Sequence, residues 1–214
     1  MTQRLYSPLD RFIHGLDLAL HTSLGPAPSP SRPSPAIAQP DNELSTAERE
    51  LAGRLMRVNH AGEVCAQGLY QGQALTAKLP AVRDKMEQAS IEENDHLAWT
   101  EERIRQVGTH TSFLTPFWYS ASYALGALAG IAGDKWSLGF VAETERQVVR
   151  HLDKHLARLP AHDAKSHAVL KLMREDEAQH ATAALAAGGA SLPTPIRKLM
   201  AMTAKLMTRT TYWF

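Results

Sequence analysis

Two Glu-x-x-His motifs are the most informative feature of the sequence: Glu93-x-x-His96 and Glu177-x-x-His180. On a helix, residues three apart lie on one face a turn apart, so each motif presents a carboxylate beside an imidazole. Each motif also follows another glutamate at a similar interval. Glu63 lies 30 residues before the first motif, and Glu145 lies 32 residues before the second. The chain therefore uses one unit twice, a helix with a glutamate and then a helix with Glu-x-x-His.

Four carboxylates and two imidazoles form a ligand set for a pair of metal ions. Four glutamates neutralise two divalent cations and can bridge them, while each neutral imidazole adds one nitrogen ligand. This combination suits iron or manganese, whereas zinc would be expected to draw more histidine or cysteine. Burying several carboxylates without cations is prohibitive, because each would cost several kcal/mol. Metal binding therefore explains why the acids are there.

Other acids near the motifs compete for the same role, namely Glu92, Glu143, Glu175 and Asp176. Glu143 is the serious rival of Glu145, because residues two apart lie on different faces of a helix. The repeat alone leaves both open.

Three further residues lie close to these positions in the sequence. His151, six residues past Glu145, is a candidate near the ligands or the substrate; the alternative is an ordinary hydrogen-bonded histidine. Tyr70 follows Glu63 by seven residues and could donate a hydrogen bond near the metals, with packing as the alternative. Cys65, the only cysteine, excludes an internal disulfide and fits a reducing compartment. We expect it to be a small buried residue rather than a reactive thiol.

Four long helices can be delimited around these residues. A capping box at Ser45-Thr46-Ala47-Glu48 begins the first, and Pro80 begins the second at its first turn. The predicted ranges are about 45–79, 80–107, 135–158 and 163–187. These signals predict an all-α protein, a ferritin-like four-helix bundle with a long apolar crossover and extra terminal helices.

The domain organisation follows from changes in composition. Residues 1–22 predict a short amphipathic helix, begun by Ser7-Pro8, that docks on the main body or on lipid. Residues 23–44 contain six prolines among serine and alanine, which predicts an extended linker with little to bury. Residues 45–190 form the bundle. Residues 191–214 predict a basic amphipathic helix packed on the bundle, with the surface of an anionic membrane as the alternative contact.

The crossover, residues 106–134, is the most apolar part of the chain. Residues 106–133 contain no Asp, Glu, Lys or Arg. The eighteen residues from Pro116 to Gly133 are at the lower limit for a membrane span, and their serine and glycine content argues against one. Two compatible interpretations remain: a buried crossover helix, or an apolar surface that touches the bilayer or admits a lipid-like substrate.

Length, composition, net charge and the absence of certain motifs argue against several classes of function. At 214 residues with 44% apolar side chains the chain can bury a sizeable core, and a net charge of +1 gives no support for a nucleic-acid partner. No secretory signal is visible, so a bacterial cytoplasmic protein is the simplest interpretation. The sequence has no Gly-x-Gly-x-x-Gly motif and no phosphate-binding loop. Electrons for any oxygen chemistry must therefore come from the substrate or from outside the bundle.

Residues 56–73 (MRVNHAGEVCAQGLYQGQ), the two Glu-x-x-His motifs and residues 141–145 (VAETE) together resemble the demethoxyubiquinone hydroxylases of ubiquinone biosynthesis. The resemblance covers about residues 45–214 and leaves the proline-rich segment outside. It implies a monooxygenase with two iron ions per chain, cycling between Fe²⁺ and Fe³⁺, and O₂ as co-substrate. The enzyme would insert one oxygen atom into the last free ring position of a polyprenylated methoxy-methyl benzoquinol.

The same resemblance implies roles for individual residues. The metal ligands would be Glu63, Glu93, His96, Glu145, Glu177 and His180. The glutamates of the two motifs would bridge the irons, Glu63 and Glu145 would each hold one iron, and Glu145 rather than Glu143 matches the family pattern. His151 matches a histidine near the substrate. Cys65 departs from the Gly or Ala expected there, which bears on packing rather than ligation.

The resemblance also implies where the protein acts. Its insoluble substrate would require peripheral contact with the cytoplasmic face of the inner membrane, through residues 106–134 and the C-terminal helix. Other proteins of ubiquinone biosynthesis are possible partners; oligomeric state, electron donor and isoprenoid length stay open. Rival interpretations are an iron-storage or detoxification protein, a di-manganese catalase, and a lipid-binding scaffold with a vestigial site.

Overall fold

The computed structural model describes residues 8–214, which form seven helices and no strand. The all-α prediction is therefore confirmed for this part of the chain, while Ser7, the predicted cap of the first helix, lies outside it. The helices are α1 (Pro8–Leu24), α2 (Thr46–Thr76), α3 (Pro80–Gln106), α4 (Thr115–Ile131), α5 (Asp134–Leu156), α6 (Ala164–Ala186) and α7 (Thr194–Thr211).

Local sequence signals explain where the long helices begin and end. Ser45 and Glu48 form the capping box that was predicted at the start of α2, and Pro80 occupies the first turn of α3. The side chain of Asp163 accepts a hydrogen bond from the Ser166 amide at the start of α6. Helix α6 ends just before Gly188, whose φ of +99° is a conformation that favours glycine.

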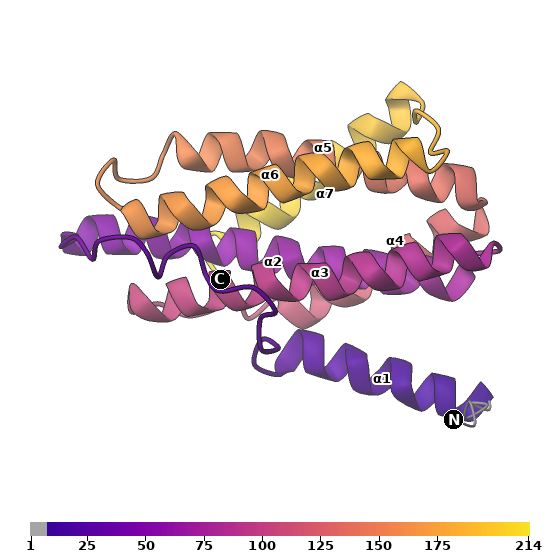
Figure 1. The fold of residues 1–214 in the computed structure, drawn as a ribbon, viewed down its shortest axis with the longest axis horizontal. Coiled ribbons are helices and arrows are strands. Elements are labelled where there is room, and N and C mark those ends of the chain that lie inside the picture. The colour runs from indigo at the N-terminus through magenta and orange to yellow at the C-terminus, as the bar shows by residue number, and fades with distance from the viewer. Residues whose placement is uncertain (1–7) are drawn as a thin grey trace.

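The long helices α2, α3, α5 and α6 lie side by side along the long axis of the molecule (Figure 1), with α2 paired with α3 and α5 paired with α6. Their apolar side chains form two separate clusters. One contains Leu55, Trp99, Leu152 and Met173, and the other contains Tyr70, Met86, Val141 and Ala184. On each of the four helices, the predicted ligands fall between a residue of one cluster and a residue of the other. The bundle is therefore built as a polar layer between two apolar layers.

Helix α4 connects the two pairs and lies directly against α2. A Cβ atom added to Gly72 would lie 2.1 Å from the carbonyl oxygen of Tyr123, and one added to Gly126 would lie 2.2 Å from that of Leu69. Gly126 and Gly130, four residues apart on α4, thus allow this helix to pack closely on α2. The outer face of α4 and the preceding loop remains exposed at Phe113, Phe117, Leu125, Leu128 and Ile131. Among residues 8–214, no helix combines the length and apolarity needed to cross a membrane.

The terminal helices pack less closely. Ala19 of α1 packs against a small cluster of Val64, Leu97 and Tyr119, whereas Ile13 and Leu20 are exposed. Helix α7 contacts α2 and α5. The apolar stripe predicted to be buried along it is exposed instead at Ile196, Leu199 and Leu206. Helix α7 is attached chiefly at its end, where Thr211 is buried and Tyr212 packs on the core.

After Leu24 the proline-rich segment has no helix, as its composition predicts, but it packs against the bundle. Ala36 and Leu44 are buried in the same cluster as Leu55 and Trp99. The expectation that this segment has little to bury is therefore wrong: small and aliphatic residues between the prolines are enough to anchor it to the bundle.

Candidate metal centre

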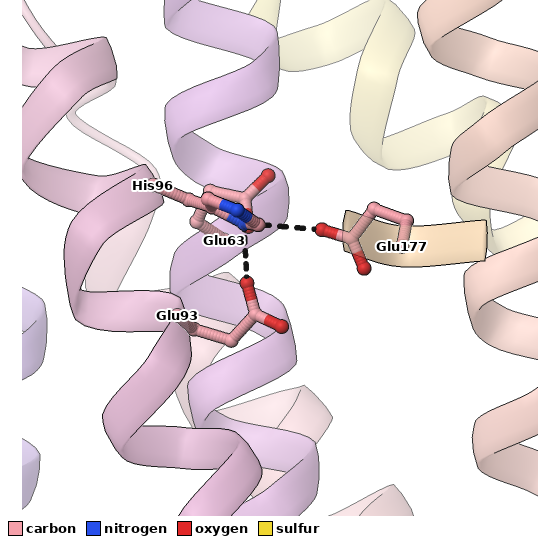
Figure 2. A group of neighbouring side chains, drawn as sticks. All are labelled: Glu63, Glu93, His96 and Glu177. Carbon is pink, nitrogen blue, oxygen red and sulfur yellow. Dashed lines mark hydrogen bonds and ion pairs between the residues drawn. The ribbon is translucent and has the colours of Figure 1, made fainter. Parts of the chain in front are cut away.

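The side chains of Glu63 on α2, Glu93 and His96 on α3, and Glu177 on α6 point toward one another in the interior (Figure 2). One ligand atom from each lies within 4.8 Å of the others, and all four residues are buried. They belong to the polar layer between the two apolar clusters. Three helices thus deliver four of the six predicted ligands to one place.

The two imidazoles share the two motif glutamates. His96 Nδ1 lies 2.7 Å from Glu93 Oε2 and 3.2 Å from Glu177 Oε1. His180 Nδ1 lies 3.1 Å from Glu93 Oε1 and 3.5 Å from Glu177 Oε2. Each of these glutamates therefore turns one oxygen toward each imidazole. Glu63 approaches from the His96 side, with Oε2 at 3.6 Å from Nδ1 of that ring.

Glu145 of α5 supplies the remaining carboxylate. It is buried, and its Oε1 accepts a hydrogen bond from the Tyr70 hydroxyl. Burial and the neighbouring carboxylates of Glu177 and Glu93 raise the pKa of Glu145 well above its usual value. The rival Glu143 is turned elsewhere, since its Oε1 accepts hydrogen bonds from Gln147 and Arg150.

Burial and neighbouring charges raise the pKa values of three residues of the cluster. Burial raises the pKa of Glu63 well above its usual value, and the charges of Glu177 and Glu93 add to this. Burial opposes charge on His180, but Glu177 and Glu93 outweigh it and raise the pKa of that imidazole to about 11. The same balance, with Glu93 as the main opposing charge, raises the pKa of His96. Cations bound here would compete with protons for these groups.

Several buried atoms of the cluster make no hydrogen bond. Glu145 Oε2 has no partner, while Glu93 Oε1 and Glu177 Oε2 have only the ion-pair contacts with His180 Nδ1 at 3.1 and 3.5 Å. Buried polar atoms are nearly always hydrogen-bonded in folded proteins, so a group of such atoms in one layer indicates a further partner. A pair of cations bound among oxygen and imidazole ligands would satisfy all of them. The residues present therefore fit the implied metal pair.

The outer nitrogens of both imidazoles meet a carboxylate from the other motif helix. His96 Nε2 lies 2.9 Å from Asp176 Oδ2, and His180 Nε2 lies 3.1 Å from Glu92 Oε2. The sequence predicted these acids only as rival ligands, so this role was not foreseen. Each acid immediately precedes the glutamate of a Glu-x-x-His motif, but its contact with the other imidazole depends on how the two motif helices meet. Glu175, the remaining rival, is exposed.

His151 lies outside this group, beside another histidine of α5. Its ring centre is 3.9 Å from that of His155, whose Nδ1 lies 3.0 Å from Asn59 Oδ1. Burial lowers the pKa of His151 to about 4, and its Nε2 is buried without a hydrogen-bond partner. It is therefore a neutral imidazole with one nitrogen available.

Cys65 lies at the contact between α2 and α4. It is half-buried and neighbours Ser122, and burial raises the pKa of its thiol to about 11. The thiol is therefore protonated at neutral pH, as expected for a packed residue rather than a nucleophile.

Comparisons with known proteins agree with this geometry. The family model described as "Ubiquinone biosynthesis protein COQ7" matches residues 50–211. A 3-demethoxyubiquinol 3-hydroxylase of Nitrosococcus oceani is 57% identical over 213 residues, covering 100% of both chains. Proteins of the same name from Pseudomonas putida (strain W619) and Stutzerimonas stutzeri (strain A1501) are 59% and 57% identical, over 99% of this chain and 98% of theirs. The chain belongs to the COQ7 family of ubiquinone biosynthesis proteins.

Proposed function

We propose that this chain is a 3-demethoxyubiquinol 3-hydroxylase, a di-iron monooxygenase that acts on the ring of a polyprenylated benzoquinol. Sequence identity of 57–59% to relatives of that name, over nearly the full length of the chain, supports the substrate and the reaction. The observation that carries the metal assignment is the cluster of Glu63, Glu93, His96 and Glu177 in the interior, with buried Glu145 and half-buried His180 beside it.

In this proposal each ligand has a distinct task. Glu93 and Glu177, each with one oxygen toward either imidazole, would hold both irons. Glu63 would hold the iron on the His96 side, and Glu145 would hold the other iron. When bound, the iron pair would supply the activation of O₂: one oxygen atom enters the ring and the other leaves as water, with an external reductant supplying two electrons and solvent supplying two protons.

The protein groups around the centre hold this arrangement. The Tyr70 hydroxyl fixes one oxygen of Glu145 and leaves the other for metal. The apolar layers above and below exclude water, which strengthens the electrostatic interactions inside. His151, neutral and with a free Nε2, is assigned as a hydrogen-bond partner of the quinol ring.

The polyprenyl tail of the substrate requires access from lipid. We assign this contact to the exposed apolar face of α4, which includes Leu125, Leu128 and Ile131, with the protein held peripherally at the cytoplasmic face of the inner membrane. Flotation with vesicles of bacterial lipid tests it. The double substitution Leu128→Lys and Ile131→Lys should reduce the vesicle-bound fraction. Binding equal to that of the unmodified protein would refute the assignment.

The decisive experiment joins metal analysis to turnover. The purified protein should hold about two irons per chain and convert demethoxyubiquinol to its hydroxylated product in detergent when O₂ and a reductant are supplied. Glu177→Gln should abolish turnover, while Glu175→Gln, on the exposed face of the same helix, should not. Iron loading far beyond two per chain would instead indicate storage. Manganese with peroxide breakdown would indicate a catalase.

A further inference from the structure

Residues 25–44, the part of the proline-rich segment that follows α1, lie across the bundle and contact it at several points; we call them the strap. At its start, the amide of Ala27 donates to Glu101 Oε2 at 2.6 Å. Near its end, the side chain of Asn42 donates to the carbonyl oxygen of His162 at 2.7 Å. Between them, Ala36 is buried in the core. The strap is therefore part of the folded unit, although it lies outside the part matched by the family model.

Arg32 is the strap residue that contacts Asp176, the acid beside His96. Its Nε donates to Asp95 Oδ2 on α3 at 2.7 Å, and its Nη2 donates to Asp176 Oδ2 on α6 at 2.8 Å. The guanidinium also lies over the Trp99 ring, 4.9 Å from its centre, and the indole nitrogen donates to the Arg32 carbonyl oxygen at 3.3 Å. The planar fork of an arginine suits such a fixed position between two carboxylates. Arg32 therefore links α3 to α6.

Only one atom separates Arg32 from a predicted metal ligand. Asp176 Oδ2, which accepts from the guanidinium, lies 2.9 Å from His96 Nε2, and Nδ1 of the same ring faces Glu93, Glu177 and Glu63. A proton held on Nε2 by Asp176 leaves the lone pair of Nδ1 free for a cation. An aspartate held by an arginine cannot rotate away from the ring.

The second imidazole lacks such support. His180 Nε2 faces Glu92 Oε2 at 3.1 Å, and the side chain of Glu92 is 46% exposed, whereas that of Asp176 is 14% exposed. Among the described residues, the Glu92 carboxylate contacts His180 and accepts a hydrogen bond from Gln88, a neutral residue. The two halves of the repeated unit are thus held unequally, one by a largely buried aspartate that Arg32 holds in turn, and the other by an exposed glutamate without an arginine partner among the described residues.

We propose that Arg32 is a positioning residue for the metal centre: through Asp176 it fixes the imidazole of His96, so that docking of the strap tightens the His96 half of the site. The inference rests on the proposed metal site and adds to it a residue from outside the four-helix bundle. Because the contacts are mutual, metal bound at His96 in turn holds the strap on the bundle. Partners of a ligating histidine typically contribute 10- to 100-fold to metal affinity.

Titration with Co²⁺, whose visible absorption reports coordination, tests the proposal on the full chain. The unmodified protein should bind two ions. Arg32→Gln should weaken one of the two binding steps by about 10- to 100-fold and leave the other within error. Arg32→Lys should recover part of the loss, since an ammonium can hold one carboxylate but not span two. The matched control is Asn42→Ala, which removes a strap contact remote from His96 and should leave both steps unchanged.

A double-mutant cycle separates positioning from a general role in folding. If Arg32 acts through Asp176, Arg32→Gln should have little further effect on Co²⁺ affinity in the Asp176→Asn background. Additive losses would overturn the proposal. So would unchanged binding in Arg32→Gln, or equal weakening of both steps in Arg32→Gln and Asn42→Ala. An unmodified protein that binds no pair of ions would overturn the proposed function as well, which distinguishes the two failures.

Discussion

Replacing Gly72 by alanine should destabilise the protein by forcing α2 and α4 apart. The new Cβ would meet the carbonyl oxygen of Tyr123 at 2.1 Å and the amide nitrogen of Ala127 at 2.8 Å, where ordinary contacts begin at 3.4 Å. Both neighbours are backbone, so the helices must separate by about 1 Å. Such overpacking costs about 1–3 kcal/mol, and the rigid neighbours place this site at the upper end. The better helix propensity of alanine returns about 1 kcal/mol, leaving a net loss of about 2 kcal/mol.

For a chain of this size, a loss of that magnitude lowers the melting temperature by about 4–8 °C. Calorimetry or thermal circular dichroism measures it on protein prepared with the same metal content. The matched control is Gly62→Ala on the same helix, where the added Cβ meets nothing within 4 Å. That variant should gain up to about 1 kcal/mol from helix propensity alone. Equal melting temperatures for the two variants would refute the argument that the backbones of α2 and α4 touch at Gly72.

Three further outcomes follow from the site. Tyr70→Phe removes the hydrogen bond that Glu145 Oε1 accepts from the Tyr70 hydroxyl, so metal retention against a chelator should fall about 10- to 100-fold, and unchanged retention would contradict this. Because the raised pKa values of Glu63 and Glu145 keep protons in the metal-free site, metal binding should release protons and tighten as pH rises; calorimetry in buffers of different ionisation heat would detect this, and a buffer-independent heat would count against it. Burial lowers the pKa of His60 from 6.5 to about 4, so the unfolded chain takes up a proton in this interval that the folded chain does not, and stability falls as pH falls. His60→Gln should therefore reduce the slope of unfolding free energy against pH by about 1.4 kcal/mol per unit between about pH 4 and 6.5, as measured by urea unfolding.

The helices that carry the site were predictable because their signals are local. A capping box, prolines in first turns and glycine after the last turn each act through neighbouring atoms, so sequence spacing is enough to locate them. The repeat of Glu-x-x-His with an upstream glutamate also predicted that acids of all four helices face inward, although the choice of Glu145 over Glu143 came from the family resemblance. Two residues three positions apart define one face of a helix. Because the same set of ligand types occurs twice, we expected the faces that carry them to meet in the bundle.

What spacing could not provide was contact between segments distant in sequence. Asp176 and Glu92 were expected to compete as ligands, but each faces the imidazole of the other motif, which only the assembled bundle reveals. The anchoring of the strap depends on Arg32 meeting Asp95, 63 residues away. The exposure of Leu199 on α7 was missed for a similar reason, since an amphipathic stripe does not say whether another element covers it.

The thiol of Cys65 offers a means to follow α2 and α4 in solution. With a pKa of about 11 and Ser122 of the facing helix beside it, the sulfur should react slowly with alkylating reagents while the two helices stay together. Each transient separation would release the sulfur to solvent and return its acidity toward that of a free cysteine. The rate at which this sulfur is labelled would therefore measure how often α2 and α4 separate. The measurement could be made in detergent, on vesicles or with substrate present.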